Sequence, residues 1–186
     1  MSRDIYHNIR ILTRIGKARA AFLMLRKVWC SREISFRTKL RIFRSNVKSV
    51  LLYGAETWRT TIRIKGRIQS FINNCFRRIF GLCWQDKVTN EEQWHWAREV
   101  PVSIQIRRRK WGWLGHTLRK PTNNITRQAL SWNPQGRRKR GRPRNSWRRD
   151  LEKEVIENGW NWTELGRRAQ NRVRWRKLVK AMCVSK

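Results

Sequence analysis

The sequence predicts an all-α protein of about seven helices, arranged as two small helical units joined by a basic arm containing Pro and Gly. Three observations lead to this prediction. Apolar residues recur at steps of three and four along most of the chain, as they do on one face of an α-helix. Residues that cap helices precede several of these runs, and Gly or Pro follows them. No stretch of useful length alternates apolar and polar residues, and no internal repeat is present.

The first 81 residues contain three predicted helices. Residues 4–29 form the first, Ser35 is the expected N-cap of a second that reaches about Tyr53, and the third runs from about Ile62 to Phe80. Gly81 ends the third helix because glycine readily adopts the left-handed conformation found after a helix. The side chains expected in the core are Ile5, Ile9, Leu12, Ile15, Ala18, Phe22, Leu25 and Trp29 of the first helix, Leu40, Phe43, Val47, Val50 and Leu51 of the second, and Ile64, Ile68, Phe71, Ile72, Cys75, Phe76 and Ile79 of the third.

Two helices are expected between residues 82 and 119. Thr89 and Glu92 have the spacing of a capping box, so a short helix begins there and ends before Pro101. A longer helix follows from about Val102 to Leu118. Its inward-facing residues are expected to be Ile104, Trp111, Leu114 and Leu118.

Residues 120–146 are predicted to be a basic linker or arm, because 120–125 are loop-like and 126–144 lack helical periodicity. The remainder, 147–186, is predicted to be a C-terminal helical hairpin. Trp147, Leu151 and Val155 step by four in its first helix, which stops at Gly159. Cap-like spacing between Asn161 and Glu164 starts a last helix, which carries Leu165, Ala169, Arg172, Trp175, Val179 and Met182.

The charge balance indicates a polyanionic partner. Lys and Arg number 45 and Asp and Glu only 12, a net charge of +33 that makes the folded chain self-repelling. RNA or DNA is the expected partner, and an anionic membrane is the second alternative. Twelve Trp and 39% hydrophobic residues argue against a disordered basic tail.

Cysteine spacing and hydropathy restrict the class of protein further. The four Cys have no CxxC spacing, which disfavours a disulfide framework and a zinc site. No apolar run approaches the ~20 residues of a membrane span, and no secretory signal is present. We therefore expect a nuclear or cytoplasmic ribonucleoprotein component that is not secreted and does not bind membranes.

The densest basic run is the first candidate site for nucleic-acid binding. Eight of the thirteen residues from Arg137 to Arg149 are Arg or Lys and none is acidic, so the run must face water or a polyanion. Its string Arg140-Gly141-Arg142-Pro143 resembles the core of an AT-hook, which lies in the DNA minor groove. A solvated linker or a nuclear-import signal is the alternative. The candidate phosphate-binding residues are Arg137, Arg138, Lys139, Arg140, Arg142, Arg144, Arg148 and Arg149, followed by Arg107, Arg108, Arg109 and Lys110.

The tryptophans form two groups. Trp29, Trp111, Trp147 and Trp175 fall on apolar stripes and are expected in the core. The others lie off these stripes or beside cations, where an indole can stack on an unpaired base and contribute about 1–3 kcal/mol; ordinary packing is the alternative. These stacking candidates are Trp84, Trp96, Trp113 and Trp132.

The acidic residues are densest between Asp150 and Glu157. They have two interpretations: a metal site, or, as we favour, salt bridges with the neighbouring arginines. His116 has no partner at metal-ligand spacing and is interpreted as a packed or hydrogen-bonded residue.

Five short motifs occur in order along nearly the whole chain. They are Arg14-Ile15-Gly16-Lys17-Ala18-Arg19-Ala20-Ala21-Phe22, Leu51-Leu52-Tyr53-Gly54-Ala55-Glu56-Thr57-Trp58, Arg77-Arg78-Ile79-Phe80-Gly81, Trp113-Leu114-Gly115-His116-Thr117-Leu118-Arg119, and Lys139-Arg140-Gly141-Arg142-Pro143-Arg144 followed by Trp147. As a series they resemble the C-terminal, thumb and post-palm part of the endonuclease–reverse transcriptase of non-LTR (LINE-type) retrotransposons. The resemblance implies that residues 1–81 are a thumb-like helical unit that follows the palm and grips a template–primer duplex. It also implies that 82–119 continue this unit, and that the basic C-terminal region holds element RNA or target DNA.

The chain departs from this family at the catalytic centre. Polymerases of this kind hold paired metal ions on carboxylates, in this family on an aromatic-x-Asp-Asp turn and an earlier Asp. Here the Asp residues are Asp4, Asp86 and Asp150, none adjacent to another, and the endonuclease constellation is also missing.

We therefore expect no catalytic residue, no metal ligand and no cofactor in this chain. Mg²⁺ would belong to a full-length parent enzyme, whose upstream palm and fingers are a further expected partner. Two alternatives stay open: an intact or complementing RNA-directed DNA polymerase subunit, and an AT-hook-like minor-groove DNA-binding protein.

Overall fold

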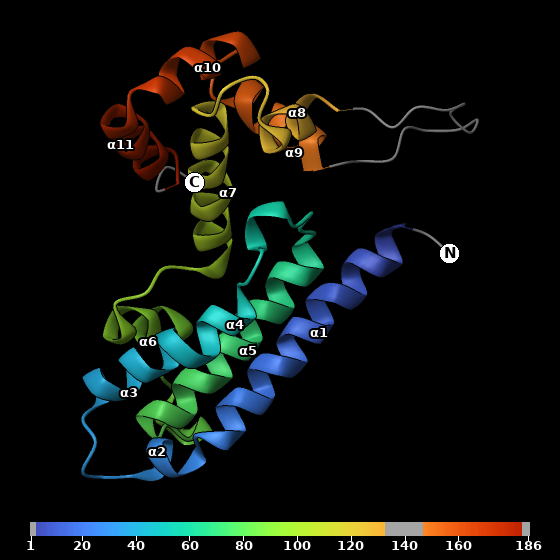
Figure 1. Cartoon of the computed structure of the whole chain (residues 1–186). Helices are drawn as coiled ribbons and strands as arrows, with labels where there is room; N and C mark the ends of the chain where they lie inside the picture. The colour runs from blue at the N-terminus through green and yellow to red at the C-terminus, as the bar shows by residue number, and fades with distance from the viewer. Residues whose placement is uncertain (1–2, 133–146, 184–186) are drawn as a thin grey trace. The chain divides into compact units, whose positions relative to one another are not determined.

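The computed structural model describes residues 3–132 and 147–183, and its side-chain description omits residues 3–8 and Trp84 (Figure 1). The described residues are helical and contain no strand, which confirms the all-α prediction. The chain divides into two compact units. Unit 1 comprises residues 1–55 and 60–106, and unit 2 comprises residues 56–59 and 107–186. The division falls inside helix α7, and not at residues 120–146, where the sequence placed the joining arm.

The two units hold the following elements in chain order. Unit 1 holds α1 (Arg3–Met24), α2 (Arg26–Cys30), α3 (Phe36–Ile42), the π-helix η1 (Phe43–Lys48), α4 (Ser49–Leu51), α5 (Ile62–Phe80), the 3-10 turn η3 (Trp84–Asp86), α6 (Asn90–Ala97) and the first residues of α7 (Val102–Leu118). The 3-10 turn η2 (Ala55–Thr57) crosses the division. Unit 2 holds the rest of α7, α8 (Ile125–Ser131), α9 (Trp147–Glu157), α10 (Trp162–Gln170) and α11 (Arg172–Met182).

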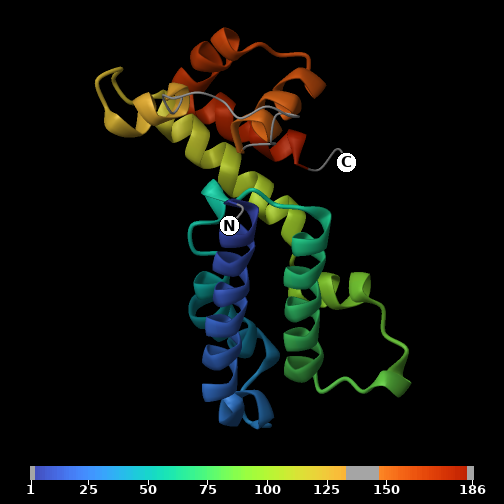
Figure 2. The same cartoon turned by 90° about the vertical axis from the view of Figure 1, so that its right-hand side faces the viewer.

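Helices α1, α2, η1 and α5 of unit 1 contribute to an aromatic core. Helices α1 and α5 run in the same direction (Figure 2), and the chain returns through α3, η1 and α4, of which η1 and α4 pack on α1 and α3 packs on α5. Phe43 of η1 contacts Phe22 of α1 and Phe76 of α5, with ring centroids 6.4 and 5.3 Å apart. Trp29 stacks on Phe22 at 4.9 Å and donates its indole N–H to the Phe22 carbonyl at 2.7 Å. Edge-on and offset aromatic contacts of this kind add to the free energy gained by burying the rings.

Sequence signals placed most of the helix ends in unit 1 correctly. Ser35 Oγ accepts a hydrogen bond from the Thr38 amide at 3.3 Å, as an N-cap does. Thr89 and Glu92 form both bonds of the predicted capping box, at 2.7 and 3.2 Å. Gly81 follows α5 with φ +70°, the left-handed value that glycine adopts without strain.

The first predicted helix needs two corrections. It is broken at Leu25, so residues 4–29 form α1 and α2. The predicted stripe is also shifted, because Ile9 and Leu12 are exposed while Ile11 is buried. Ile11, Ile15, Ala18 and Phe22 recur at helical spacing and form the face that packs on η1 and α4.

The core of unit 2 is built on Trp111 of α7, whose side chain is completely buried. The rings of Trp160 and Trp175 lie 6.0 and 5.9 Å from it, and Trp175 Nε1 donates to the Trp111 carbonyl at 3.1 Å. Gly115, one turn further along α7, allows the Trp175 indole to approach the helix backbone, since a Cβ at Gly115 would overlap that ring. This contact requires glycine at position 115.

The structure also corrects the C-terminal predictions. Residues 125–131 form α8 inside the predicted linker, with Asn124 as its N-cap. The last predicted helix is two helices, because the backbone of Asn171 is extended and its side chain caps α11 by accepting from the Arg174 amide at 3.0 Å. Residues 133–146 of the predicted arm lie outside the described residues.

Candidate nucleic-acid interface

The densest basic run is described only at its end. Arg137, Arg138, Lys139, Arg140, Arg142 and Arg144 lie outside the described residues, while Arg148 and Arg149 occupy the first turn of α9. Arg148 pairs with Glu152 at 2.8 Å and donates to the Leu130 carbonyl at 3.0 Å. Its guanidinium also lies 5.6 Å from the centre of the Trp162 ring. These contacts fix Arg148 within unit 2, and its predicted phosphate contact stays a prediction.

The second basic run is largely neutralised by unit 2 itself. Arg107, Lys110 and Trp111 lie on one face of α7 because they are three and four residues apart. All three donate to the carboxylate of Glu154, at 3.1, 3.3 and 2.6 Å. Arg109 lies 3.6 Å from the carboxylate of Glu56. These three cations therefore have a structural role; their phosphate contacts stay predictions.

The structure also describes the surroundings of Arg108 and of the acidic residues of α9. The Arg108 Nε is buried without a hydrogen-bond partner in the described part of the chain. Glu152 pairs with the neighbouring Arg148, as the salt-bridge interpretation predicted, whereas Glu154 pairs with Arg107 and Lys110 of the distant α7. Among the residues that the structure describes, no three His, Cys, Asp or Glu side chains form a group able to hold a metal ion. In the same residues, no helix combines the length and apolarity needed to cross a bilayer.

Two of the four stacking candidates present a wide surface to solvent. Trp132 is 67% exposed, and Trp96 is 48% exposed although its ring packs edge-on against Phe80 at 5.8 Å. Trp113 is half-buried and packs edge-on against Trp147 at 5.6 Å. The side chain of Trp84 lies outside the description. Of the predicted core tryptophans, Trp29, Trp111 and Trp175 are buried, whereas Trp147 is half-buried and donates to the Glu56 carbonyl.

An unpredicted group of three arginines lies in unit 2, and we call it the arginine cluster: Arg119, Arg172 and Arg176. Arg172 and Arg176 are one turn apart on α11, so they share a face. Arg119 follows α7 and donates to the Ala169 carbonyl of α10 at 2.9 Å, which holds it beside the start of α11. Burial lowers the pKa of Arg119, and the nearby charges of Arg172 and Arg176 lower it further.

The arginine cluster lacks internal compensation. None of its members forms an ion pair within residues 3–132 and 147–183. The N-terminal end of α11 adds the positive end of a helix dipole at Arg172. Like charges held together raise the free energy of the folded chain, and a bound anion would offset this cost.

A signal for this cluster is visible in the sequence. Residues 165–183 include no Asp or Glu, while seven of them are Arg or Lys, and all seven are exposed. These cations stand among the apolar residues of a helix that the sequence pattern marks as packed, and the denser run at 137–149 dominates the charge profile. Those seven residues are Arg167, Arg168, Arg172, Arg174, Arg176, Lys177 and Lys180.

Comparison with known proteins connects this chain with mobile elements. Residues 21–53, from the end of α1 to the turn after α4, match a family described as "Domain of unknown function (DUF6451)". The chain is 27% identical over 125 residues to a Caenorhabditis elegans protein described as "Putative uncharacterized transposon-derived protein". That match covers 63% of this chain and 44% of the relative, so the chain matches less than half of the relative's length. No solved structure matches the chain.

Proposed function

We propose that this chain is a nucleic-acid-binding part of a transposon-encoded protein, and that it binds RNA or DNA phosphates mainly without sequence specificity. More finely, we propose that it corresponds to the thumb and post-palm region of a non-LTR retrotransposon reverse transcriptase, without a polymerase or nuclease centre of its own. The similarity to a transposon-derived protein supports the first statement. The motif series from Arg14 to Trp147 supports the second.

The arginine cluster is the observation that carries the binding proposal. Arg119 is held on α10 near enough to Arg172 and Arg176 of α11 for their charges to lower its pKa, and within the described residues none of the three forms an ion pair. Guanidinium groups and the N-terminal end of a helix both bind phosphate oxygens. A nucleic-acid backbone would supply several phosphates to this surface, whereas a small anion would supply one.

The test is a salt titration of binding to a fluorescein-labelled RNA and to a DNA duplex of the same length. If about 6–8 phosphates are contacted, the logarithm of the affinity falls with the logarithm of salt concentration at a slope near −5 to −7. Removing two phosphate contacts with Arg172→Ala and Arg176→Ala makes this slope less steep by roughly 2. The control is Arg41→Ala with Arg37→Ala, two exposed arginines of α3. A slope that the cluster variant leaves unchanged would refute the assignment.

A primer-extension assay with Mg²⁺ separates this proposal from a polymerase. We expect the pure chain to incorporate no nucleotide, because its sequence lacks the paired carboxylates that hold the metal ions. Metal-dependent incorporation by the pure chain would support the polymerase alternative. Strong preference for AT-rich duplex over RNA and over GC-rich duplex would support minor-groove binding by the Arg140–Pro143 string.

A further inference from the structure

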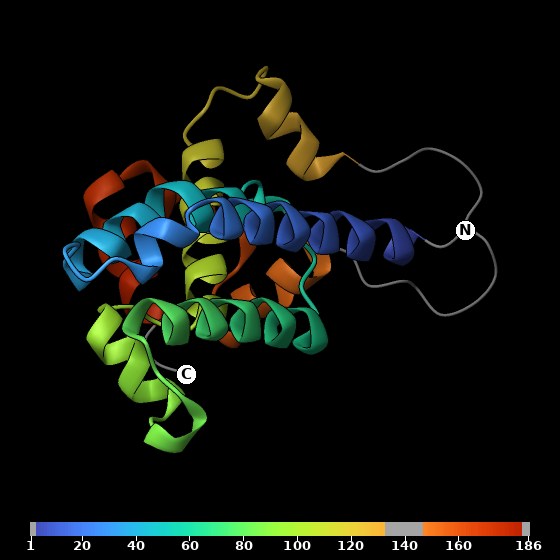
Figure 3. The same ribbon diagram turned by 90° about the horizontal axis from the view of Figure 1, so that it is seen from below.

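An open groove runs between α1 and α5 of unit 1. The two helices lie side by side along their length (Figure 3), and the groove between them has a volume of about 1120 Å³. This volume exceeds the range of about 300–1,000 Å³ typical of small-molecule pockets. The groove is therefore large enough for a segment of a macromolecule.

The α1 wall of the groove exposes leucine side chains. Leu12 and Leu23 line it and are 42% and 52% exposed. They are eleven residues apart, which is close to three helical turns, so they lie on the same side of α1. Two leucines that face an open groove, and not the core, form an apolar surface of the kind that partner proteins cover.

The α5 wall permits close approach of another backbone. Gly66, Ser70 and Asn74 line it at successive turns of the helix. Beyond the position where Gly66 would carry a Cβ there is open space, with no atom within 4 Å. Small side chains at such spacing let the axes of two packed helices approach each other.

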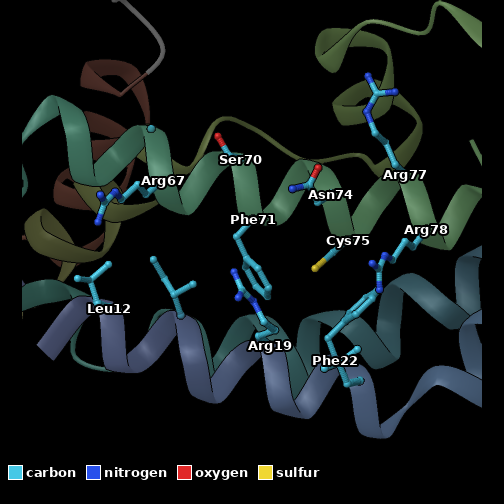
Figure 4. A pocket seen from close by; sticks show the side chains of 13 residues that line it. Leu12, Arg19, Phe22, Arg67, Ser70, Phe71, Asn74, Cys75, Arg77 and Arg78 are labelled. Carbon is cyan, nitrogen blue, oxygen red and sulfur yellow. The ribbon is translucent and has the colours of Figure 1, made fainter. Parts of the chain in front are cut away.

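The charged residues in the groove are all positive. Arg19, Arg67 and Arg78 point into the space between the helices (Figure 4), and no Asp or Glu lines the groove. Within the described ranges these three form no ion pair. Arg77 is different, because it donates to the Val88 carbonyl at 3.1 Å and points away from the groove.

Exposed leucine and arginine side chains together indicate which anionic partner fits the groove. A single nucleic-acid strand binds best where aromatic rings are exposed for its bases, but the groove's Phe22 and Phe71 are buried, at 4% and 9% exposure. A duplex keeps its bases stacked inside and offers the leucines little apolar surface. An amphipathic helix with acidic flanks can pack apolar residues on the leucines and pair carboxylates with the arginines of the groove. We propose that the α1–α5 groove docks an acidic amphipathic helix of a protein partner, whose apolar residues cover Leu12 and Leu23 and whose carboxylates pair with Arg19, Arg67 and Arg78.

The first experiment measures binding of a labelled peptide to the full chain by fluorescence anisotropy. The probe is a helical peptide of about 18 residues, or five turns, with Leu at i, i+3, i+4 and i+7 and Glu on both flanks. A second peptide of the same composition distributes the Leu residues around the helix. Because both peptides carry the same charge, we expect the amphipathic one to bind at least roughly tenfold more tightly. Equal affinity of the two peptides would overturn the proposal, because attraction to the net charge alone would then account for binding.

The second experiment locates the peptide. Leu12→Glu with Leu23→Glu should weaken amphipathic-peptide binding at least roughly tenfold. The matched control places the same two charges at exposed apolar positions of unit 2, Ile125→Glu with Ile156→Glu, and should weaken it much less. If circular dichroism shows that the groove variant has lost helix, Arg19→Gln with Arg67→Gln replaces it. Unchanged peptide affinity in a folded groove variant would overturn the proposal.

The third measurement separates a protein partner from nucleic acid. We expect a thymidine oligonucleotide of about 20 residues to bind the Leu12→Glu, Leu23→Glu variant as well as the Ile125→Glu, Ile156→Glu control, because both variants carry the same added charge. A selective loss of oligonucleotide binding in the groove variant would assign the groove to single-stranded nucleic acid instead. The proposal is independent of the arginine cluster, since Arg172→Ala and Arg176→Ala should affect oligonucleotide binding more than peptide binding.

Discussion

Two glycines of α7, one turn apart, should respond in opposite directions to the same substitution. Gly112 is exposed and a Cβ there would meet no atom within 4 Å. Gly112→Ala should therefore stabilise the chain by about 0.5–1 kcal/mol, the usual gain from replacing glycine inside a helix. Gly115→Ala gains the same helix propensity but drives its methyl group into the indole of Trp175.

The expected cost of Gly115→Ala follows from what the displaced indole loses. Overpacking in a core costs typically 1–3 kcal/mol. Moving Trp175 also removes its hydrogen bond to the Trp111 carbonyl and leaves a buried N–H without an acceptor, which costs about 1–3 kcal/mol more. After subtraction of the helix gain, the net destabilisation is about 3 kcal/mol.

Urea unfolding followed by tryptophan fluorescence and far-ultraviolet circular dichroism measures both variants. The two free energies of unfolding should differ by about 4 kcal/mol, with Gly112→Ala above the parent chain and Gly115→Ala below it. Near-ultraviolet circular dichroism should change only for Gly115→Ala, because only there does the Trp111–Trp175 geometry move. A Gly115→Ala protein as stable as Gly112→Ala would show that the Trp175 contact is wrong.

Three other predictions follow from side chains in defined environments. Glu154→Ala should destabilise the chain by about 2–3 kcal/mol in urea unfolding, because it leaves the buried Lys110 without its carboxylate. Glu152→Ala loses only an exposed ion pair and should destabilise the chain by about 0.5 kcal/mol or less, so equal destabilisation by the two variants would contradict this reasoning. With Ellman's reagent near neutral pH, the exposed Cys30 and Cys83 should react at once. Cys75, whose pKa is raised by burial to about 12, and the buried Cys183 should react only after unfolding. Four fast thiols in the folded chain would refute this. Hydrogen bonds from Thr89 lower the pKa of Glu92, so the cap of α6 is stabilising above the unfolded-state pKa and is lost as pH falls below about 4. Amide exchange at α6 should accelerate in this acidic range in the parent chain and should depend less on pH in Glu92→Gln.

Most helix bounds and caps could be predicted from the sequence, because interactions between residues close in the sequence determine them. The bounds of α5 and α7, the N-caps Ser35 and Thr89, and the left-handed turn at Gly81 all depend on residues within a few positions of one another. The break at Leu25 and the division of the last helix at Asn171 carry no Pro or Gly. At Asn171 the asparagine N-cap is a local signal that the apolar periodicity concealed, whereas tertiary packing buries Ile11 in place of Leu12.

The candidate binding residues depend even more on contacts between residues that are distant in the sequence, which local patterns do not predict. Charge density alone treated Arg107 and Lys110 as phosphate ligands, but a helical face directs both to Glu154, 44 or more residues away. Arg119 lies near enough to Arg172 for that charge to lower the Arg119 pKa, although about 50 residues separate the two in the sequence, and no local pattern predicts this proximity. Charge composition therefore predicts a class of partner, and the distribution of the few acids determines which cations are available to bind it.

The scarcity of acids gives the chain an uneven tolerance to substitution. Only 12 of 186 residues are Asp or Glu, and several of them hold helices together: Glu99 joins Arg44 and Lys48 of η1, and Glu154 joins three residues of α7. Most exposed arginines that form no ion pair can be replaced with little loss of folding, because removing one positive charge lowers the self-repulsion of a chain with a net charge of +33. Among diverging relatives of this chain, carboxylates at these positions should therefore persist longer than cations on the surface.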